Sequence, residues 1–351
     1  MTRSDVDGRN AIWVSRVVES AGDRLPLPTP VAGLLTVGLV PYLLTVAFVL
    51  SLPAVRSPTF VPLQALAATI AVVGPILIRH YDEHVFPTFV SEAEEVVVER
   101  RDLLETVDRY ERFFRDRYWL TAVPWTGHVL LALVFNFGYF AAVGVPGYRS
   151  VSFATYLVFG AWWSLLTGIG LHGMLTTILC VRSVADLELS IDPLHHDGLG
   201  GLSAIGYFSI RATLMNSAGA FALPLAFAIA GSGGLEHLVY AAVAGYVGIL
   251  LVSFLYPTLY VNRRAQEVRE AVLREKRRRI RELQARTAAD SDGGRLDDLE
   301  TQLRIRTLRD DFHEHRDVNL YPLSVSILLR LGSSILLPIA FTLLDTYVFT
   351  N

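Results

Sequence analysis

The chain has 351 residues, 52% of them hydrophobic, and its mean hydropathy is positive. A formal net charge of only −3 argues against a nucleic-acid partner. The single cysteine, Cys180, excludes an internal disulfide. The single lysine, Lys276, lies in a charged stretch, which excludes a retinal protein because such a protein needs a lysine within a membrane span.

The first 29 residues are polar or mildly amphipathic and are expected to form a cytoplasmic segment. A short apolar pattern includes Ile12, Trp13, Val17 and Val18. This pattern is compatible with a short helix that lies on the membrane surface. It is equally compatible with a frayed terminus, since the ends of many domains are poorly ordered.

Seven long apolar segments follow, and each is long enough to cross about 30 Å of hydrocarbon as a helix. We therefore predict an all-α polytopic membrane protein with seven transmembrane helices, located in the cell membrane with the lipid bilayer as its partner. The first six segments and their connections occupy residues 30–260. The segments are residues 30–53, 59–79, 119–144, 151–181, 204–231, 235–260 and 321–348.

The basic residues predict the orientation of these segments. Of the 31 lysine and arginine residues, 28 lie in the N-terminal segment, in the long connections or just inside the spans that border them. The short connections contain only Arg56 and Arg149. By the positive-inside rule the N-terminus and the long connections, including residues 80–118 and 182–203, are cytoplasmic, and the C-terminus is outside.

Residues 261–320 are predicted to form a cytoplasmic helical hairpin between the sixth and seventh spans. Apolar residues recur at helical spacing in 262–289 and again in 296–318, and the Asp-Ser-Asp-Gly-Gly run at 290–294 separates the two. We expect such helices to mediate self-association into a homo-oligomer. Alternatively, the basic cluster at 274–281 could bind anionic lipid and make the chain a scaffold.

The connection at 191–201, with the sequence Ile-Asp-Pro-Leu-His-His-Asp-Gly-Leu-Gly-Gly, is unusually polar for its position before the fifth span. Together with two histidines at the end of the second span, it offers a possible site for a divalent metal. The simpler interpretation is a tight turn, since Asp-Pro and Asp-Gly are ordinary turn formers. No cofactor is otherwise predicted. The candidate metal ligands are His80, His84, His195, His196 and Asp197.

The seventh segment differs from the others because it carries a charge, Arg330, near its middle. A charge at this depth usually faces a bundle interior or water. On a helix, the first half of the face around Arg330 is polar and the second half is apolar, as expected for a water-lined surface closed by a hydrophobic constriction. An arginine that snorkels to the interface is the alternative. The candidate pore-lining residues are Ser326, Arg330, Ser333, Leu337 and Phe341.

In layout the chain resembles the insect odorant and gustatory receptors and their seven-span channel relatives. The resemblance lies in the cytoplasmic N-terminus, the outer C-terminus and the helical lead-in at 296–318 before a last span at 321–348. The Thr-Tyr…Gln-Phe signature of that family is not reproduced, because Thr346-Tyr347 stands alone. The resemblance implies an oligomeric channel, or a ligand-responsive receptor-channel, lined by the last span. The alternatives are a membrane-embedded metal-dependent hydrolase or a small-solute carrier.

Overall fold

The computed structural model describes residues 12–52, 60–190, 192, 195, 200–289 and 295–317, and these residues form helices without a sheet. Six of the helical stretches are long and apolar enough to cross a membrane, so the chain is a multi-pass membrane protein. The seventh expected span, 321–348, lies outside the described residues. The six stretches are Thr29–Leu50, Phe60–Ala93, Arg100–Phe135, Val151–Ala185, Ile205–Ala230 and Glu236–Arg286.

Several of these stretches consist of consecutive helices separated by a local change of helix type. A π-helical turn interrupts the first and the second, and a 3₁₀ turn interrupts the fifth. Such turns expose backbone carbonyls that a regular α-helix would pair internally. The helices are α1 (Trp13–Arg24), α2 (Thr29–Gly33), η2 (Leu34–Gly38), α3 (Leu39–Leu50), α4 (Phe60–His80), η3 (Tyr81–Val85), α5 (Phe86–Ala93), α6 (Arg100–Arg117), α7 (Trp119–Phe135), α8 (Phe137–Ala142), α9 (Val151–Ala185), α10 (Ser203–Ser217), η4 (Ala218–Ala222), α11 (Leu223–Ala230), α12 (Glu236–Ala289) and α13 (Arg295–Asp317).

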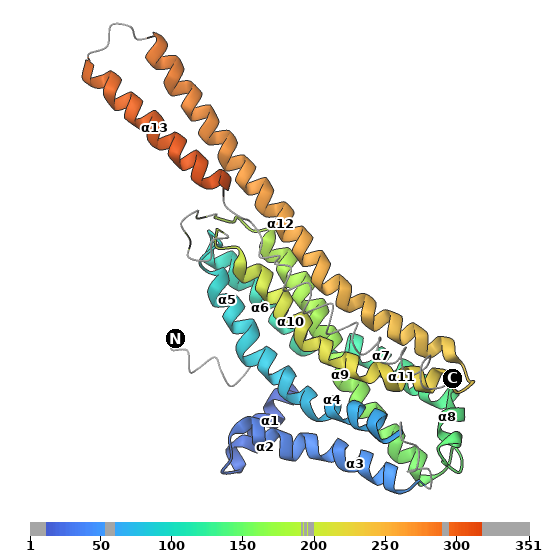
Figure 1. Cartoon of the computed structure of the whole chain (residues 1–351). Helices are drawn as coiled ribbons and strands as arrows, with labels where there is room; N and C mark the ends of the chain where they lie inside the picture. Colours follow the sequence, from blue (N-terminus) through green and yellow to red (C-terminus); the bar gives the residue numbers. More distant parts are fainter. Residues whose placement is uncertain are drawn as a thin grey trace.

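Helix α9 is the central helix of the bundle, and α3, α4, α6, α7, α10 and α12 all contact it (Figure 1). The apolar part of α9 that is long enough to cross a membrane is 72% buried inside the protein. This share is larger than that of any other candidate span among the described residues. Glycines allow neighbouring helices to come close to it, as small residues commonly do in membranes. At Gly168, for example, an added Cβ would lie 2.7 Å from the Cα of Ala122 on α7.

The third apolar segment ends earlier than expected. We predicted a span over 119–144, but α7 stops at Phe135 and the short helix α8 follows after Asn136. The Asn136 amide donates hydrogen bonds to the carbonyls of Ala132 (2.7 Å) and Leu235 (3.3 Å). A buried amide that bonds to backbone competes with the helix ladder, which explains the break.

Helix α1 is not placed as the sequence suggested. Its apolar face, with Ile12, Val14 and Val18, is buried within the protein, and α1 packs against α2 and α4. The backbone N–H of Ile12 donates to Asp82 Oδ2 at 3.2 Å, so a carboxylate from η3 caps the start of the helix. A frayed tail is therefore wrong for residues 12–24, and the expected short helix is present over Trp13–Arg24. Its position relative to the membrane surface stays a prediction.

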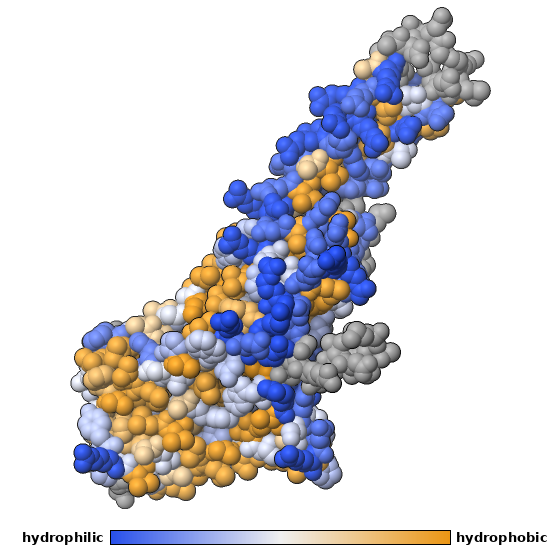
Figure 2. All heavy atoms as spheres, turned by 180° about the vertical axis from the view of Figure 1, so that it is seen from behind, coloured by the Kyte–Doolittle hydropathy of each residue, from blue (hydrophilic) through white to orange (hydrophobic). Residues whose placement is uncertain are grey.

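Helix α12 continues without interruption from the bundle into a projection that we call the stalk, made of α13 and of α12 from Tyr260 to Ala289 (Figure 1). The two helices expected over 262–289 and 296–318 are present here, and they pack against each other. Hydrophobic surface covers the bundle, whereas hydrophilic surface dominates the stalk (Figure 2). This change of surface marks where α12 leaves the apolar part of the molecule.

Candidate functional site

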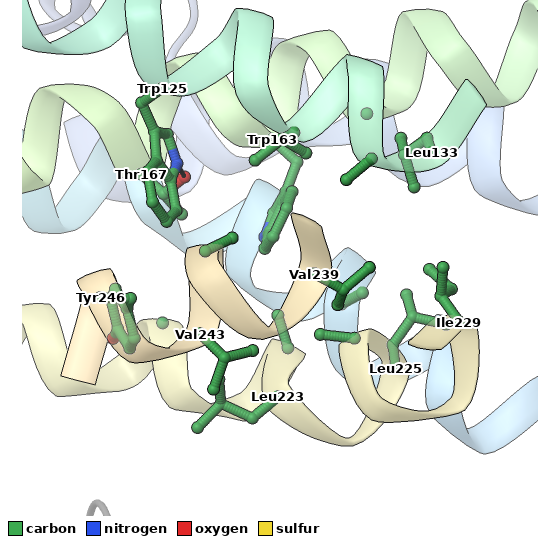
Figure 3. Close-up of a pocket in the computed structure, with 18 of the residues that line it drawn as sticks. Trp125, Leu133, Trp163, Thr167, Leu223, Leu225, Ile229, Val239, Val243 and Tyr246 are labelled. Atoms are coloured by element: carbon green, nitrogen blue, oxygen red, sulfur yellow. Dashed lines mark hydrogen bonds between the residues drawn. The ribbon is translucent and has the colours of Figure 1, made fainter. Parts of the chain in front are cut away.

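An apolar cavity of about 90 Å³ lies inside the bundle, toward the end opposite the stalk (Figure 3). We call it the distal chamber. Helices α4, α7, α9, α11 and α12 line it together with η4, so residues distant in sequence meet around one space. Its wall includes Ala67, Trp125, Leu133, Trp163, Thr167, Leu225, Ile229, Val239, Val243 and Tyr246.

Three aromatic residues of the wall differ in whether their polar atoms have hydrogen-bond partners. Trp125 Nε1 donates to Thr167 Oγ1 at 2.9 Å, and the Tyr246 hydroxyl donates to the Asn216 carbonyl at 2.6 Å. The buried Nε1 of Trp163 finds no acceptor among the described residues. A buried donor without a partner costs about 1–3 kcal/mol, so an acceptor brought here by a ligand or a water would stabilise the fold.

A second group of polar atoms borders the chamber one helical turn from Ala67. Gln64 on α4 is 1% exposed, and its amide forms no hydrogen bond of good geometry among the described residues, although two phenols lie close enough to interact with it. The amide lies beside the phenols of Tyr139 and Tyr156, and Tyr156 also lines the chamber. A polar side chain at this depth in an apolar helix is expensive and usually has a function.

A smaller cavity of about 70 Å³, the proximal chamber, continues along α4 and α9 toward the stalk. The two chambers share Thr167, Gly219 and Tyr246 in their walls. Four glycines are among the residues that line the proximal chamber, which ends near Tyr81 and Phe114. A water occupies about 30 Å³, and an engineered apolar cavity of about 150 Å³ binds benzene, so the two chambers together suit a small organic molecule.

The 3₁₀ turn η4 separates the chambers on one side. It interrupts the fifth span between α10 and α11 and thereby leaves the Asn216 carbonyl available to the Tyr246 hydroxyl. This hydrogen bond joins α10 to α12 where the chambers meet. A rotation of the Tyr246 side chain would therefore open one chamber to the other and break a contact between two helices.

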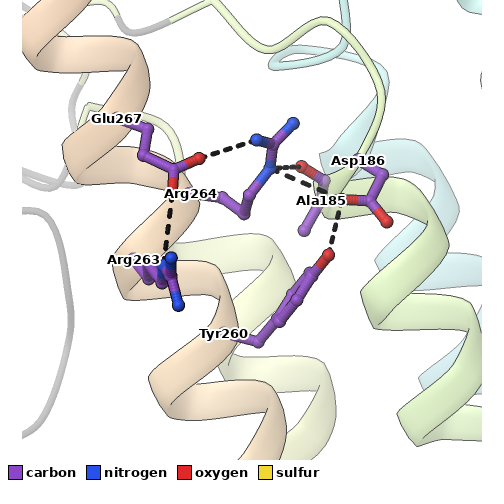
Figure 4. A network of polar contacts seen from close by, with 6 residues as sticks. All are labelled: Ala185, Asp186, Tyr260, Arg263, Arg264 and Glu267. Carbon is purple, nitrogen blue, oxygen red and sulfur yellow. Dashed lines mark hydrogen bonds and ion pairs between the residues drawn. The ribbon is translucent and has the colours of Figure 1, made fainter.

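Polar contacts join α9 to α12 where α12 leaves the bundle (Figure 4). We call this cluster the joint. The Tyr260 hydroxyl donates to Asp186 Oδ1 at 2.6 Å, and Arg264 Nη1 bonds Glu267 Oε2 at 2.7 Å. Arg264 Nε also reaches the carbonyl of Ala185 and Asp186 Oδ1, both at 3.4 Å. The carbonyl is one of the unpaired groups at the end of α9, so the arginine both caps α9 and anchors α12.

The proposed metal ligands do not form a cluster within the described part of the chain. The rings of His80 and His84 stack with their centroids 5.1 Å apart, and His195 Nε2 contacts Glu95 Oε2 at 3.1 Å. His196 and Asp197 lie outside the described residues. No group of three or more histidine, cysteine, aspartate or glutamate side chains suitable for a metal occurs among the residues that the structure describes.

Two histidines within the candidate spans form hydrogen bonds between helices. His172 Nδ1 lies 3.1 Å from Thr121 Oγ1, and its Nε2 lies 3.1 Å from the Phe113 carbonyl. His128 Nε2 contacts the Leu238 carbonyl at 2.8 Å. Each histidine joins its own span to another helix, which makes it a structural residue.

The candidate pore residues lie outside the described part of the chain, and sequence reasoning missed the chambers. The pore candidates are Ser326, Arg330, Ser333, Leu337 and Phe341. Apolar wall residues look like any lipid-facing or core residue in a sequence. Gln64 is the residue that could have indicated a chamber, because it is a polar residue near the start of the apolar run 59–79.

Comparisons of the chain with protein-family models, with curated proteins and with solved structures find no match.

Proposed function

We propose that this multi-pass membrane protein is a receptor that binds a small, mainly apolar molecule in the space that the distal and proximal chambers form together. The observation that carries the proposal is the chamber, an apolar space lined by five helices and η4, with the buried Nε1 of Trp163 in its wall lacking an acceptor among the described residues. Apolar walls with a few polar groups are typical of small-molecule sites. The ligand class that fits is a compact hydrocarbon-like molecule with one hydrogen-bond acceptor, such as a ketone.

Helix α12 offers a direct route from the chamber to the stalk. Val239, Val243 and Tyr246 line the chamber, and the same helix then passes through the joint at Tyr260 and Arg264. At 1.5 Å per residue the 54 residues of α12 extend about 80 Å. A ligand that shifts the near part of a rigid helix also moves its far part, so binding can be communicated over this distance.

The proposed orientation places the N-terminus and the stalk in the cytoplasm of a cell that carries the protein in its plasma membrane. We further propose that several copies assemble through the stalk and that the last apolar segment, with Arg330, lines an ion pathway that the receptor opens. The distribution of arginines supports the orientation. The layout shared with insect odorant and gustatory receptors supports the receptor-channel.

Ligand binding is tested with cyclohexanone and cyclohexane as matched probes on purified protein in lipid nanodiscs. Both should change the tryptophan fluorescence, because Trp125 and Trp163 line the chamber. One hydrogen bond is worth about 1 kcal/mol, so the ketone should bind roughly fivefold more tightly than the hydrocarbon. The chamber-filling variants Ala226→Phe and Val243→Trp should abolish the response to both probes.

The control for this experiment is Leu131→Phe on α7, where the side chain is 53% exposed and faces away from the chamber. This variant should respond like the unmodified protein. Equal responses of the filled variants and the control would show that the probes act through the lipid, and the receptor proposal would fail.

The ion pathway is tested by flux from reconstituted vesicles. Arg330→Ala should change the anion-to-cation permeability ratio, because a ring of positive charge repels cations. Arg330→Lys keeps the charge and serves as the control, with permeability close to that of the unmodified protein. Unchanged flux and selectivity in Arg330→Ala would remove the last segment from the pathway while leaving ligand binding untouched.

A small-solute carrier is the second candidate, and one observation favours it. The two chambers follow one another along α4 and α9 and are separated at Thr167, Gly219 and Tyr246. A carrier needs such a path within one chain, whereas a channel lined by one helix per copy needs several chains. Solute uptake by vesicles that contain single copies would favour the carrier.

A further inference from the structure

A groove of about 660 Å³ runs along α1 where this helix lies beside η2. We call it the α1 groove. Most of its lining residues come from α1, and one comes from η2. The described residues that line it are different from those that line the two chambers, so it is a separate feature of the molecule. The lining residues include Trp13, Arg16, Val17, Ser20, Arg24 and Thr36.

The packing of α1 keeps the groove in place. Val14 and Val18 on another side of the helix are fully buried. An added Cβ at Gly33 would lie 2.5 Å from Val18 Cγ1, so α2 comes very close to α1, and the two helices lie side by side (Figure 1). The Ile12 N–H bond to Asp82 fixes the start of the helix. The groove is therefore built from helices that are held by the rest of the bundle.

The groove lies where the charged end of the bundle meets its apolar part. Asp82, which caps α1, follows directly after Arg79 and His80 at the end of α4. Thr36, at the other side of the groove, lies seven residues after Thr29, the first residue of the first candidate span. Seven helical residues extend about 10 Å. The groove thus reaches from the level of lipid headgroups into the outer part of the hydrocarbon.

Two arginines of the groove are exposed, and neither has a carboxylate partner among the described residues. Other arginines of the chain are paired, such as Arg79 with Glu83. At about 100° per residue, Ser20 lies 40° from Arg16 and a further 40° from Arg24, so it lies midway between them on one face. The Ser20 hydroxyl forms no hydrogen bond with a described residue and is available to donate.

This face concentrates positive charge around one position. A phosphate above Ser20 would lie about 6 Å along the helix from both Arg16 and Arg24, a distance that an extended arginine side chain covers. Guanidinium groups bind phosphate oxygens with two parallel hydrogen bonds. The acids of α1, Glu19 and Asp23, are not among the residues that line the groove, so they leave the charge uncompensated there.

An apolar surface adjoins the arginines. Val17 in the groove is 44% exposed, and Trp13 supplies an indole of the kind that favours membrane interfaces. On the first span, Val40 and Leu43 follow Thr36 at spacings of four and seven residues, which places them on the same face. They are 57% and 53% exposed. A molecule that contacts both surfaces must carry an anionic group and a hydrocarbon chain.

We propose that the α1 groove binds one anionic phospholipid, with its phosphate between Arg16 and Arg24 and an acyl chain along Val40 and Leu43. Anionic lipids are concentrated in the cytoplasmic leaflet, the side on which the arginine distribution places α1. A free phosphate would use the arginines alone. The bound lipid joins α1 to the first span and couples the stability of the bundle to the membrane composition. This site is independent of ligand binding in the chambers.

The test titrates the full-length protein in a neutral detergent with dioleoyl phosphatidylglycerol and counts bound lipids by native mass spectrometry. One lipid per chain should bind tightly, and dioleoyl phosphatidylcholine should bind at least tenfold more weakly. The double variant Arg16→Gln/Arg24→Gln should weaken phosphatidylglycerol binding roughly thirtyfold, because each basic residue near a lipid surface contributes about 1 kcal/mol. Arg279→Gln/Arg286→Gln removes the same charge from exposed positions of the stalk and should leave the affinity unchanged.

A second pair of variants tests the position of the phosphate without removing an arginine. Ser20→Glu places a carboxylate where the phosphate should lie and should abolish tight binding. Ser20→Gln has the same size without the charge and should retain it. Thermal unfolding in detergent without added lipid verifies that both variants are folded.

Three results would overturn the proposal. Equal affinity for the two lipids would show that the headgroup charge is not recognised. Displacement of phosphatidylglycerol by excess inorganic phosphate would show that the groove binds a soluble anion. Loss of binding in the stalk variant, with full binding in the groove variant, would place the lipid on the basic cluster at 274–281.

Discussion

Within the bundle, α12 buries Tyr246, Leu250 and Phe254 against neighbouring helices. In the stalk, beyond Leu273, none of the described residues of the same helix is buried. In the stalk α12 is tied to α13 by polar contacts: Lys276 Nζ lies 3.7 Å from Asp311 Oδ2, and the Arg277 guanidinium lies over the Phe312 ring at 5.0 Å. One continuous helix is thus stabilised by packing at one end and by charge at the other. The bundle part should be rigid, and the stalk part should respond to salt.

The largest expected effect comes from a leucine deletion inside the bundle. Leu250→Ala should lower the free energy of unfolding by about 2–5 kcal/mol, because it removes a buried side chain and leaves a cavity. The matched change in the stalk, Leu303→Ala, should alter it by less than about 0.5 kcal/mol, since Leu303 is 65% exposed. Unfolding in mixed detergent micelles measures both, and equal effects would break the comparison.

A smaller effect is expected in the stalk, and it should depend on salt. Asp311→Asn removes the partner of Lys276 and should weaken the docking of α13 by at most about 1 kcal/mol at low ionic strength. In 1 M salt the screening length is about 3 Å, so the difference should disappear. Hydrogen exchange of the α13 amides reports the docking. Asp310→Asn, an exposed neighbour, is the control.

The smallest effect concerns α1 and should depend on pH. The pKa of Glu19 is raised above its ordinary value, first by burial and then by the nearby Glu83 carboxylate. An acid with a raised pKa in the folded state favours folding while it is protonated. Its contribution is therefore lost as pH rises from the ordinary pKa through the raised one. Glu19→Gln should remove this part of the pH dependence of Tm, and Asp23→Asn should not.

The parts of the fold that follow from one helix at a time could be predicted from the sequence. Six apolar runs became helices, although the second and sixth helical stretches continue beyond their apolar runs and the third stops at Phe135; the charged hairpin helices are present in the stalk. Each depends on local composition and period, which a sequence contains directly. The roles of His128 and His172 were also predictable, because a buried imidazole in a span needs a partner on another helix.

The parts that depend on several helices could not be predicted. The packing of α1 depends on contacts with α2 and α4 and on a hydrogen bond to Asp82, which lies 70 positions away in the sequence. The break at Asn136 depends on the carbonyl of Leu235. The chambers form only where several helices pack together, so the sequence of one segment does not predict them. The metal hypothesis required histidines and acids from separate segments to come together. Among the described residues they form no group of three or more potential ligands.

The cap on α1 also constrains the order in which the chain is assembled. Ile12 and Asp82 are separated by 70 positions, so the partner of the first helix does not exist when that helix leaves the ribosome. At typical synthesis rates the delay is on the order of 10 s. During that time the apolar face of α1 lacks its partner from η3, so the helix completes its packing only after α4 has been synthesised.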